Sequence, residues 1–277
     1  MKARLAQCLL ALLTLTSSCL RAGVGAEGIP VAGGGSIRYV IGLSPFLEKG
    51  VKDDVYRRIV GFLLGEAPLG SSFWLCDAYR LQTITRVEIP EVRSFRSAKT
   101  RANQFKEPIH KLKEFLAARH EPAATNILQL EPAVRFPQFM DFVGENLQSS
   151  GLPVVVIVLG SPLYLDPREP GFSMVDGYFP SDGHLQASRE QSVFGTKDRA
   201  KALQNIVVHF SYFGDPWVSE VHREKIARFW ELYLSAQGAR LAAFCGDIAT
   251  TFNAVRAGLS SKESRQTIHA FDPKQSK

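Results

Sequence analysis

Pro153-Val-Val-Val-Ile-Val-Leu-Gly160 is an unbroken apolar run, and Arg38-Tyr-Val-Ile-Gly-Leu43 is a second run of the same kind. Continuous runs rich in β-branched residues are typical of strands that are buried on both faces of a parallel sheet. Both runs lead directly into polar turns, Ser44-Pro45 and Ser161-Pro162. Because α/β folds bind ligands at the carboxyl ends of such strands, these turns mark the expected site. Neither turn contains an aspartate, the residue type that most often carries metal or phosphoryl chemistry there.

The rest of the chain supplies neighbours for these two strands. Further strands are predicted at residues 71–78, 83–89, 206–213 and 240–245, and the short connection between the first two indicates an antiparallel hairpin. Apolar periodicity predicts helices after the first strand, after Pro108, over 125–147 with proline breaks, over 218–236 and over 248–259. Alternating strands and helices with right-handed crossovers predict an α/β fold with a doubly wound, mostly parallel six-stranded sheet and helices on both faces.

This order of elements resembles the von Willebrand factor type A domain over residues 38–259. The resemblance implies the strand order 3-2-1-4-5-6, with the third strand antiparallel. It also implies a divalent-cation site made of an Asp-x-Ser-x-Ser motif after the first strand, a threonine from a later loop and an aspartate after the fourth strand.

The cation site that the resemblance implies is degenerate in this chain. Its first motif falls on residues 42–46, where only Ser44 matches, Thr125 is the candidate for the threonine, and Ser161 stands in place of the aspartate. Two hydroxyl groups without a carboxylate make a poor site for a divalent cation, so we expect no metal ion and no other cofactor. Nucleotide binding is not expected either, because no glycine-rich phosphate motif follows any strand.

The first 26 residues are predicted to be a signal peptide. They combine a basic start, a short apolar core at residues 8–15 and a small-residue cleavage site that ends at Ala26. A lipid anchor at Cys19 is the alternative, although Thr16 stands where that motif prefers a leucine. We therefore expect a secreted or periplasmic protein with no transmembrane segment after cleavage. The mature chain is expected to comprise a flexible lead-in (27–37), one domain (38–259) and a polar tail (260–277).

Charge gives no support to a nucleic-acid role. The predicted signal peptide carries three of the 33 basic residues and none of the 27 acidic ones, which leaves 30 against 27 and a net charge of +3. The only basic run has two interpretations, a solvated loop leading into a helix or an anion-binding patch. Its members are Arg93, Arg96, Lys99, Arg101 and Lys106.

Two cysteines, Cys76 and Cys245, remain after removal of the signal peptide. An even number of cysteines in an exported protein suggests a disulfide. The strand order that the resemblance implies instead places these residues on opposite sides of the sheet, beyond the reach of a bridge. Two buried free thiols are therefore predicted.

The longest irregular segment, residues 161–197, is the second candidate site. Asp176, Asp182 and His184 could converge as metal ligands or as a general acid–base set, or the aspartates could simply form turns. Aromatic residues are interleaved with them, including Tyr178 and Phe179. Long irregular segments in compact domains are usually functional or disordered, and aromatic residues argue against disorder. The segment is therefore expected to be a folded lid or a partner-contacting loop.

Asp215 and Trp217 precede the helix predicted over 218–236, whose apolar, inward-facing side is expected to include Val218, Val221 and Ile226. Asp215 is expected to cap that helix and Trp217 to pack over the strand ends, with a binding role for the pair as the alternative. His209 and His222 are expected to be structural.

Together these features predict a non-enzymatic module that binds a protein partner in the cell envelope. Aromatic residues on an exposed loop are of the type that dominates binding energy at protein interfaces. The alternative is a periplasmic hydrolase whose metal or acid–base centre is built from the residues of the 161–197 segment, and a small-molecule sensor is a third, weaker option.

Overall fold

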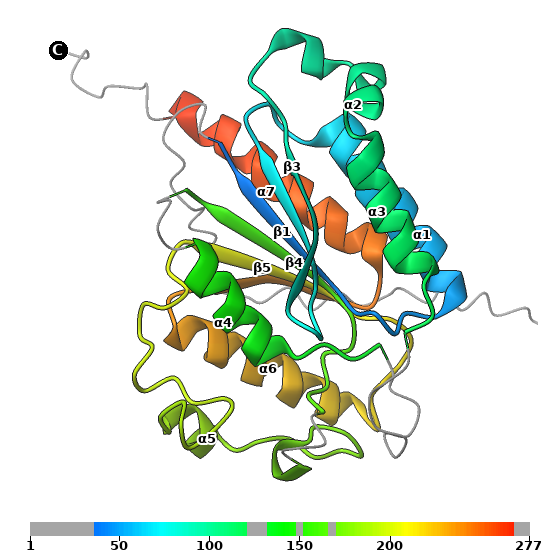
Figure 1. Ribbon diagram of the computed structural model, residues 1–277. Coiled ribbons are helices and arrows are strands. Elements are labelled where there is room, and N and C mark those ends of the chain that lie inside the picture. The colour runs from blue at the N-terminus through cyan, green and yellow to red at the C-terminus, as the bar shows by residue number, and fades with distance from the viewer. Residues whose placement is uncertain (1–35, 121–131, 148–151, 166–169, 269–277) are drawn as a thin grey trace, which may run out of the picture.

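The computed structural model describes residues 36–120, 132–147, 152–165 and 170–268. Its centre is a six-stranded sheet in the order β3-β2-β1-β4-β5-β6 (Figure 1). Only the β2–β3 pair is antiparallel, and the other neighbours are parallel. The predicted fold class, strand order and hairpin are thus confirmed. The strands are β1 (Arg38–Leu43), β2 (Ser72–Asp77), β3 (Gln82–Glu88), β4 (Val154–Leu159), β5 (Ile206–Ser211) and β6 (Arg240–Cys245).

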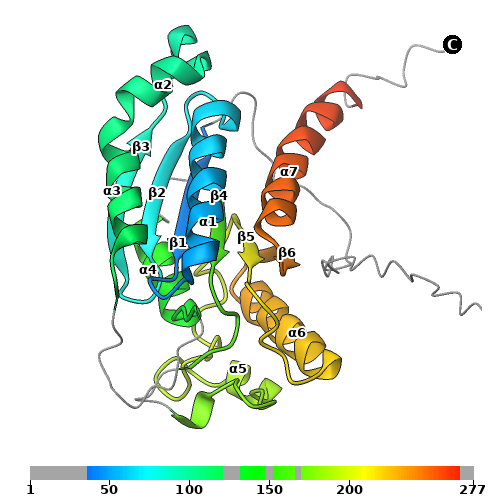
Figure 2. The same ribbon diagram turned by 90° about the vertical axis from the view of Figure 1, so that its right-hand side faces the viewer.

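Helices cover both faces of the sheet, as Figures 1 and 2 show. One face is covered by α1 (Lys49–Gly61), α3 (Lys106–Ala117) and α7 (Ile248–Ile268), and the other by α4 (Phe136–Leu147) and α6 (Glu220–Ala236). The remaining elements are η1 (Phe62–Glu66), η2 (Arg93–Arg96), α2 (Ala98–Gln104), η4 (Pro170–Phe172) and α5 (Asp182–Gln186).

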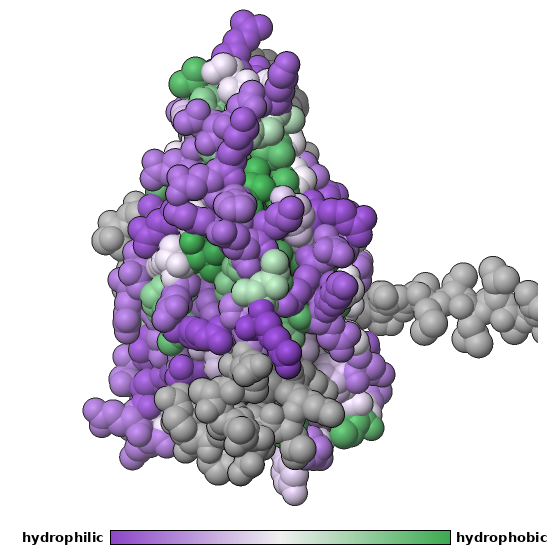
Figure 3. Space-filling view, turned by 45° about the vertical axis from the view of Figure 1, so that its right-hand side comes forward, coloured by the Kyte–Doolittle hydropathy of each residue, from purple (hydrophilic) through white to green (hydrophobic). Residues whose placement is uncertain are grey.

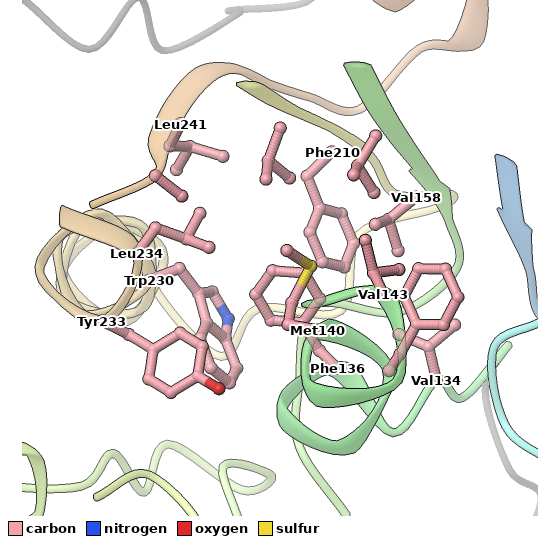
Figure 4. Close-up of a cluster of buried hydrophobic side chains, with 14 of the residues drawn as sticks. Val134, Phe136, Met140, Val143, Val158, Phe210, Trp230, Tyr233, Leu234 and Leu241 are labelled. Carbon is pink, nitrogen blue, oxygen red and sulfur yellow. The ribbon is translucent and has the colours of Figure 1, made fainter. Parts of the chain in front are cut away.

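The apolar runs of β1 and β4 are continuous because each strand buries side chains on both faces. In β4, Val154, Val156 and Val158 point into the core beneath α4 and α6, while the residues between them point toward α1 and α7. Figure 4 shows aromatic side chains of α4 and α6 in the first of these cores, with the Trp230 ring lying between the two helices. The rings of Phe136 and Trp230 meet edge to face at 4.9 Å. Phe136 also meets Phe210 of β5, with ring centres 5.2 Å apart.

Several element boundaries differ from the predictions. The helix predicted from Pro108 begins at Lys106, and the helix predicted from residue 218 begins at Glu220. The fifth strand ends at Ser211 instead of residue 213. The last helix continues to Ile268, beyond its predicted end at 259 and into the predicted polar tail.

The cysteine prediction is right for one residue and wrong for the other. Cys76 is a buried free thiol, whereas Cys245 is disulfide-bonded. Four strand spacings separate β2 from β6, about 19 Å, so the two cannot bond to each other.

Within the described residues, none of the helices combines the length and the apolar character needed to cross a membrane.

Candidate functional site

The two predicted serines lie together at the carboxyl edge of the sheet, between β1 and β4. The backbone N–H of Ser44 donates to the carbonyl oxygen of Leu159 at 2.9 Å, and Ser161 follows two residues later. The connections from β1 and β4 leave toward opposite faces of the sheet, and this switch point is where open α/β sheets form a crevice. Both serines are buried there. Thr125, the predicted third member, lies outside the described residues.

Each serine hydroxyl accepts a local hydrogen bond. Ser44 Oγ accepts from the N–H of Phe46 at 3.2 Å, and Ser161 Oγ accepts from the N–H of Leu163 at 3.3 Å. This is ordinary turn chemistry for serine. Among the residues that the structure describes, no three His, Cys, Asp or Glu side chains gather in a way that could hold a metal ion.

The switch-point crevice is filled by the chain that leads into α4. The carbonyl oxygen of Pro132 accepts a hydrogen bond from the N–H of Ser161 at 2.5 Å. A Cβ atom added to Gly160 would lie 2.5 Å from Val134 Cγ1 and 2.8 Å from the Pro132 oxygen. A Cβ atom added to Gly42 would lie 2.5 Å from the ring of Phe139. Glycine is therefore required at both strand ends because side chains of this chain occupy the space above them.

The 161–197 segment is folded onto α4 and α6. Tyr164, Met174, Leu185 and Phe194 are buried in the same core as the two helices. The Phe194 ring is central to this packing, since it contacts four aromatic rings edge to face. These belong to Tyr164, Phe172, Phe229 and Trp230.

Ion pairs and a hydrogen bond also connect the segment to α4 and α6. Asp141 of α4 forms ion pairs with Arg189 and Arg199, each with a closest distance of 2.8 Å. The indole N–H of Trp230 donates to the carbonyl oxygen of Pro162 at 2.8 Å. Apolar and charged contacts thus hold the described parts of the segment, 161–165 and 170–197, against the rest of the domain.

In the described part of the chain, Asp176, Asp182 and His184 do not gather into a metal site. Asp176 has a positive φ of 56° and Gly177 one of 83°, and the N–H of Tyr178 bonds to the Val175 carbonyl, which defines a type I′ turn. Asp182 lies in the first turn of α5 and pairs with Arg228 on the surface. His184 packs its ring against Phe172. The turn interpretation of Asp176 is confirmed, and the structure does not bring the three residues together as metal ligands.

Four exposed apolar residues gather where this segment meets the start of α6; we call them the rim patch. Tyr178 is 69% exposed, Phe179 44%, Val218 62% and Val221 58%. A Cβ atom added to Gly177 would lie 2.9 Å from Val218 Cγ2, and Lys225 Nζ, one turn beyond Val221, lies 4.0 Å from the centre of the Phe179 ring. Figure 3 shows a mostly hydrophilic face with hydrophobic groups in a few places, one at the lower right where α6 begins.

The sequence pattern predicted Val218 and Val221 to face inward, and this was wrong. The buried face of α6 is the stripe that begins at His222 and continues through Ile226, Phe229, Trp230 and Tyr233. Val221 is five residues before Ile226, which places it well away from that stripe on a helix of 3.6 residues per turn. A strict count of the periodicity back from Trp230 would have identified His222 as the buried position.

Asp215 and Trp217 have different roles. Trp217 packs against Tyr212 and Phe244, with ring centres 5.2 and 6.0 Å away, as predicted. The expected cap at Asp215 is wrong, because Ser219 caps α6 by accepting from the N–H of His222 at 3.1 Å. Asp215 is exposed.

No known protein-family profile matches the chain, and no curated protein is significantly similar to it.

Proposed function

We propose that this chain is a non-enzymatic binding module of the von Willebrand factor type A kind, which contacts a protein partner through the rim patch. One observation carries the proposal. Of the five large apolar side chains that are exposed in the described part of the chain, four belong to the rim patch. Gathered exposed apolar side chains mark interaction sites, whereas single ones are common on any surface.

The rim patch is held by a rigid frame. Tyr178 and Phe179 follow a hydrogen-bonded turn, and the backbone carbonyl of Tyr178 accepts from His222 of α6. Val218 and Val221 lie at the N-terminal end of a seventeen-residue helix that packs on the sheet. A surface that is ordered before binding loses less conformational entropy when a partner docks, which favours affinity.

The filled crevice supports a site away from the usual cation position. Ser44 and Ser161 are buried, and Pro132 and Val134 lie against Gly160 beside them, whereas the residues of the rim patch are exposed. The predicted signal peptide supports a partner in the cell envelope, in keeping with a secreted or periplasmic protein.

The test is capture of the partner by cross-linking in the envelope. Variants distinguish binding through the rim patch from non-specific association. The double variant Tyr178→Ala/Phe179→Ala should lose the cross-linked partner while its melting temperature stays close to that of the unchanged protein. Gln186→Ala/Glu190→Ala is the control, because both residues are exposed on the same 161–197 segment outside the rim patch. Equal capture by both variants and the unchanged protein would refute the proposal.

A further inference from the structure

A second exposed surface lies at the opposite end of the molecule from the rim patch. Residues 92–106, here called the basic tip, connect β3 to α3 and include η2 and α2. Figures 1 and 2 both show α2 at the top of the molecule and α5 at the bottom. The tip therefore projects away from the 161–197 segment in both views.

Buried contacts within the basic tip hold its backbone in place. The rings of Phe95 and Phe105 pack with centres 5.9 Å apart. The buried guanidinium of Arg101 donates to the carbonyl oxygen of Phe95 at 2.5 Å and to that of Leu63 at 2.9 Å. Arg101 thus belongs to the interior of the tip and is not part of its charged surface.

The other basic residues of the tip face solvent. Arg93, Arg96 and Lys99 are exposed and have no acidic partner among the described residues. Arg93 and Arg96 are three apart in a 3₁₀ turn, which places them on the same side. Some exposed cations elsewhere are paired, such as Lys111 with Glu107 and Arg228 with Asp182.

One apolar side chain accompanies these charges. Val92 is 52% exposed and directly precedes Arg93. Lys106 adds a further exposed cation at the base of the tip. Glu88, Glu91 and Glu107 are exposed acids nearby, and Glu107 pairs with Lys111. The tip is therefore a projecting surface with an excess of positive charge and an apolar residue beside it.

We infer that the basic tip binds an anionic lipid surface. A bilayer with anionic headgroups attracts each nearby Lys or Arg without needing a shaped pocket, and an exposed apolar side chain can enter the headgroup layer. A rigid projection with unpaired cations fits this partner better than a protein interface, whose core is depleted of charge. The rim patch, at the other end, would remain free to contact its protein partner.

The experiment is co-sedimentation of the full chain with lipid vesicles. The protein should sediment with vesicles made of equal parts phosphatidylcholine and phosphatidylglycerol but not with phosphatidylcholine alone, and binding should fall as salt rises. Each cation near such a surface strengthens binding roughly fivefold, so Arg93→Glu/Arg96→Glu/Lys99→Glu should weaken it by roughly a hundredfold or more. The control Lys113→Glu/Lys197→Glu/Lys201→Glu changes the net charge equally at exposed positions elsewhere and should bind nearly as well as the unchanged chain.

Three results would overturn the inference. They are equal binding to neutral vesicles, equal loss in the two triple variants, and binding to poly-glutamate or to nucleic acid without binding to anionic vesicles. Tyr178→Ala/Phe179→Ala should still bind anionic vesicles, so a failure of the rim-patch proposal would leave this result unchanged.

Discussion

Nε2 of His222 lies 3.1 Å from the carbonyl oxygen of Tyr178, so a residue buried on α6 holds the backbone of the most exposed aromatic residue of the rim patch. The same nitrogen lies 3.0 Å from the Met174 carbonyl. Both partners are acceptors, so Nε2 must carry the hydrogen. This side chain connects the core of the domain to the rim patch.

His222→Ala should loosen the segment before the rim patch. One buried carbonyl group and one partly buried one lose their donor, which should lower the free energy of unfolding by about 1–3 kcal/mol. Hydrogen exchange should accelerate at Tyr178, whose N–H bonds to Val175 within the turn. His110→Ala, on the exposed face of α3, is the control and should change neither quantity. Unchanged exchange at Tyr178 in His222→Ala would show that His222 does not position the patch.

Gly160→Ala tests whether the crevice is filled. Its Cβ would meet Val134 and the Pro132 carbonyl at distances that require movement, so the free energy of unfolding should fall by about 1–3 kcal/mol. Gly61→Ala is a control of opposite sign, because nothing lies within 4 Å of its Cβ and alanine favours a helix by about 0.5–1 kcal/mol. Denaturant unfolding measures both. A neutral Gly160→Ala would mean that the space above β4 is open.

Asp141 should be more important than any other acid for holding the 161–197 segment. Asp141→Asn leaves Arg189 and Arg199 largely buried without their counter-charge, and we expect a loss of about 3 kcal/mol in the free energy of unfolding. Asp182→Asn is the matched control, because its pair with Arg228 is exposed and such pairs contribute about 0–1 kcal/mol. Equal losses in the two variants would contradict the role of burial.

The sheet could be predicted because its signals are local. The runs in β1 and β4 are apolar throughout, and the short connection between β2 and β3 excludes a crossover. The ends of the helices and strands were harder to predict from the sequence, because they depend on packing between elements. The fifth strand ends at Ser211, where its pairing with Cys245 ends.

The filling of the crevice could not be predicted, because it depends on contacts between distant parts of the chain. In the sequence, Gly160 marks the end of a strand. Its neighbours along the chain do not indicate that Val134 and Pro132 will lie against it. Ser44 and Ser161 were correctly placed at one edge, since the strand order decides that position.

Two of the four residues of the rim patch could be predicted from the sequence. Tyr178 and Phe179 stood out as aromatic residues beside a turn, but Val218 and Val221 were assigned to the helix interior. That error followed from starting the helix too early and from expecting Asp215 to cap it, when Ser219 does.

His209 makes the stability of the domain sensitive to acid. It is buried in β5, where desolvation, with a smaller effect of Arg240, lowers the pKa of its imidazole to about 3 from the ordinary 6.5. Between these two values the unfolded chain takes up a proton that the folded chain does not. Stability should therefore fall as the pH drops through this range, by up to about 1.4 kcal/mol per pH unit from this residue.

The variant His209→Leu removes this titration. Whatever its stability at neutral pH, its free energy of unfolding should decline less than that of the unchanged protein between about pH 6.5 and about pH 4, because the unfolded state no longer gains this proton. Val207→Ala is the control, since Val207 is buried in the same strand and has no titratable group, and it should keep the original slope. Urea unfolding at several pH values measures the slopes. Parallel slopes for His209→Leu and the unchanged protein would mean that His209 takes up its proton equally in the folded and unfolded chain.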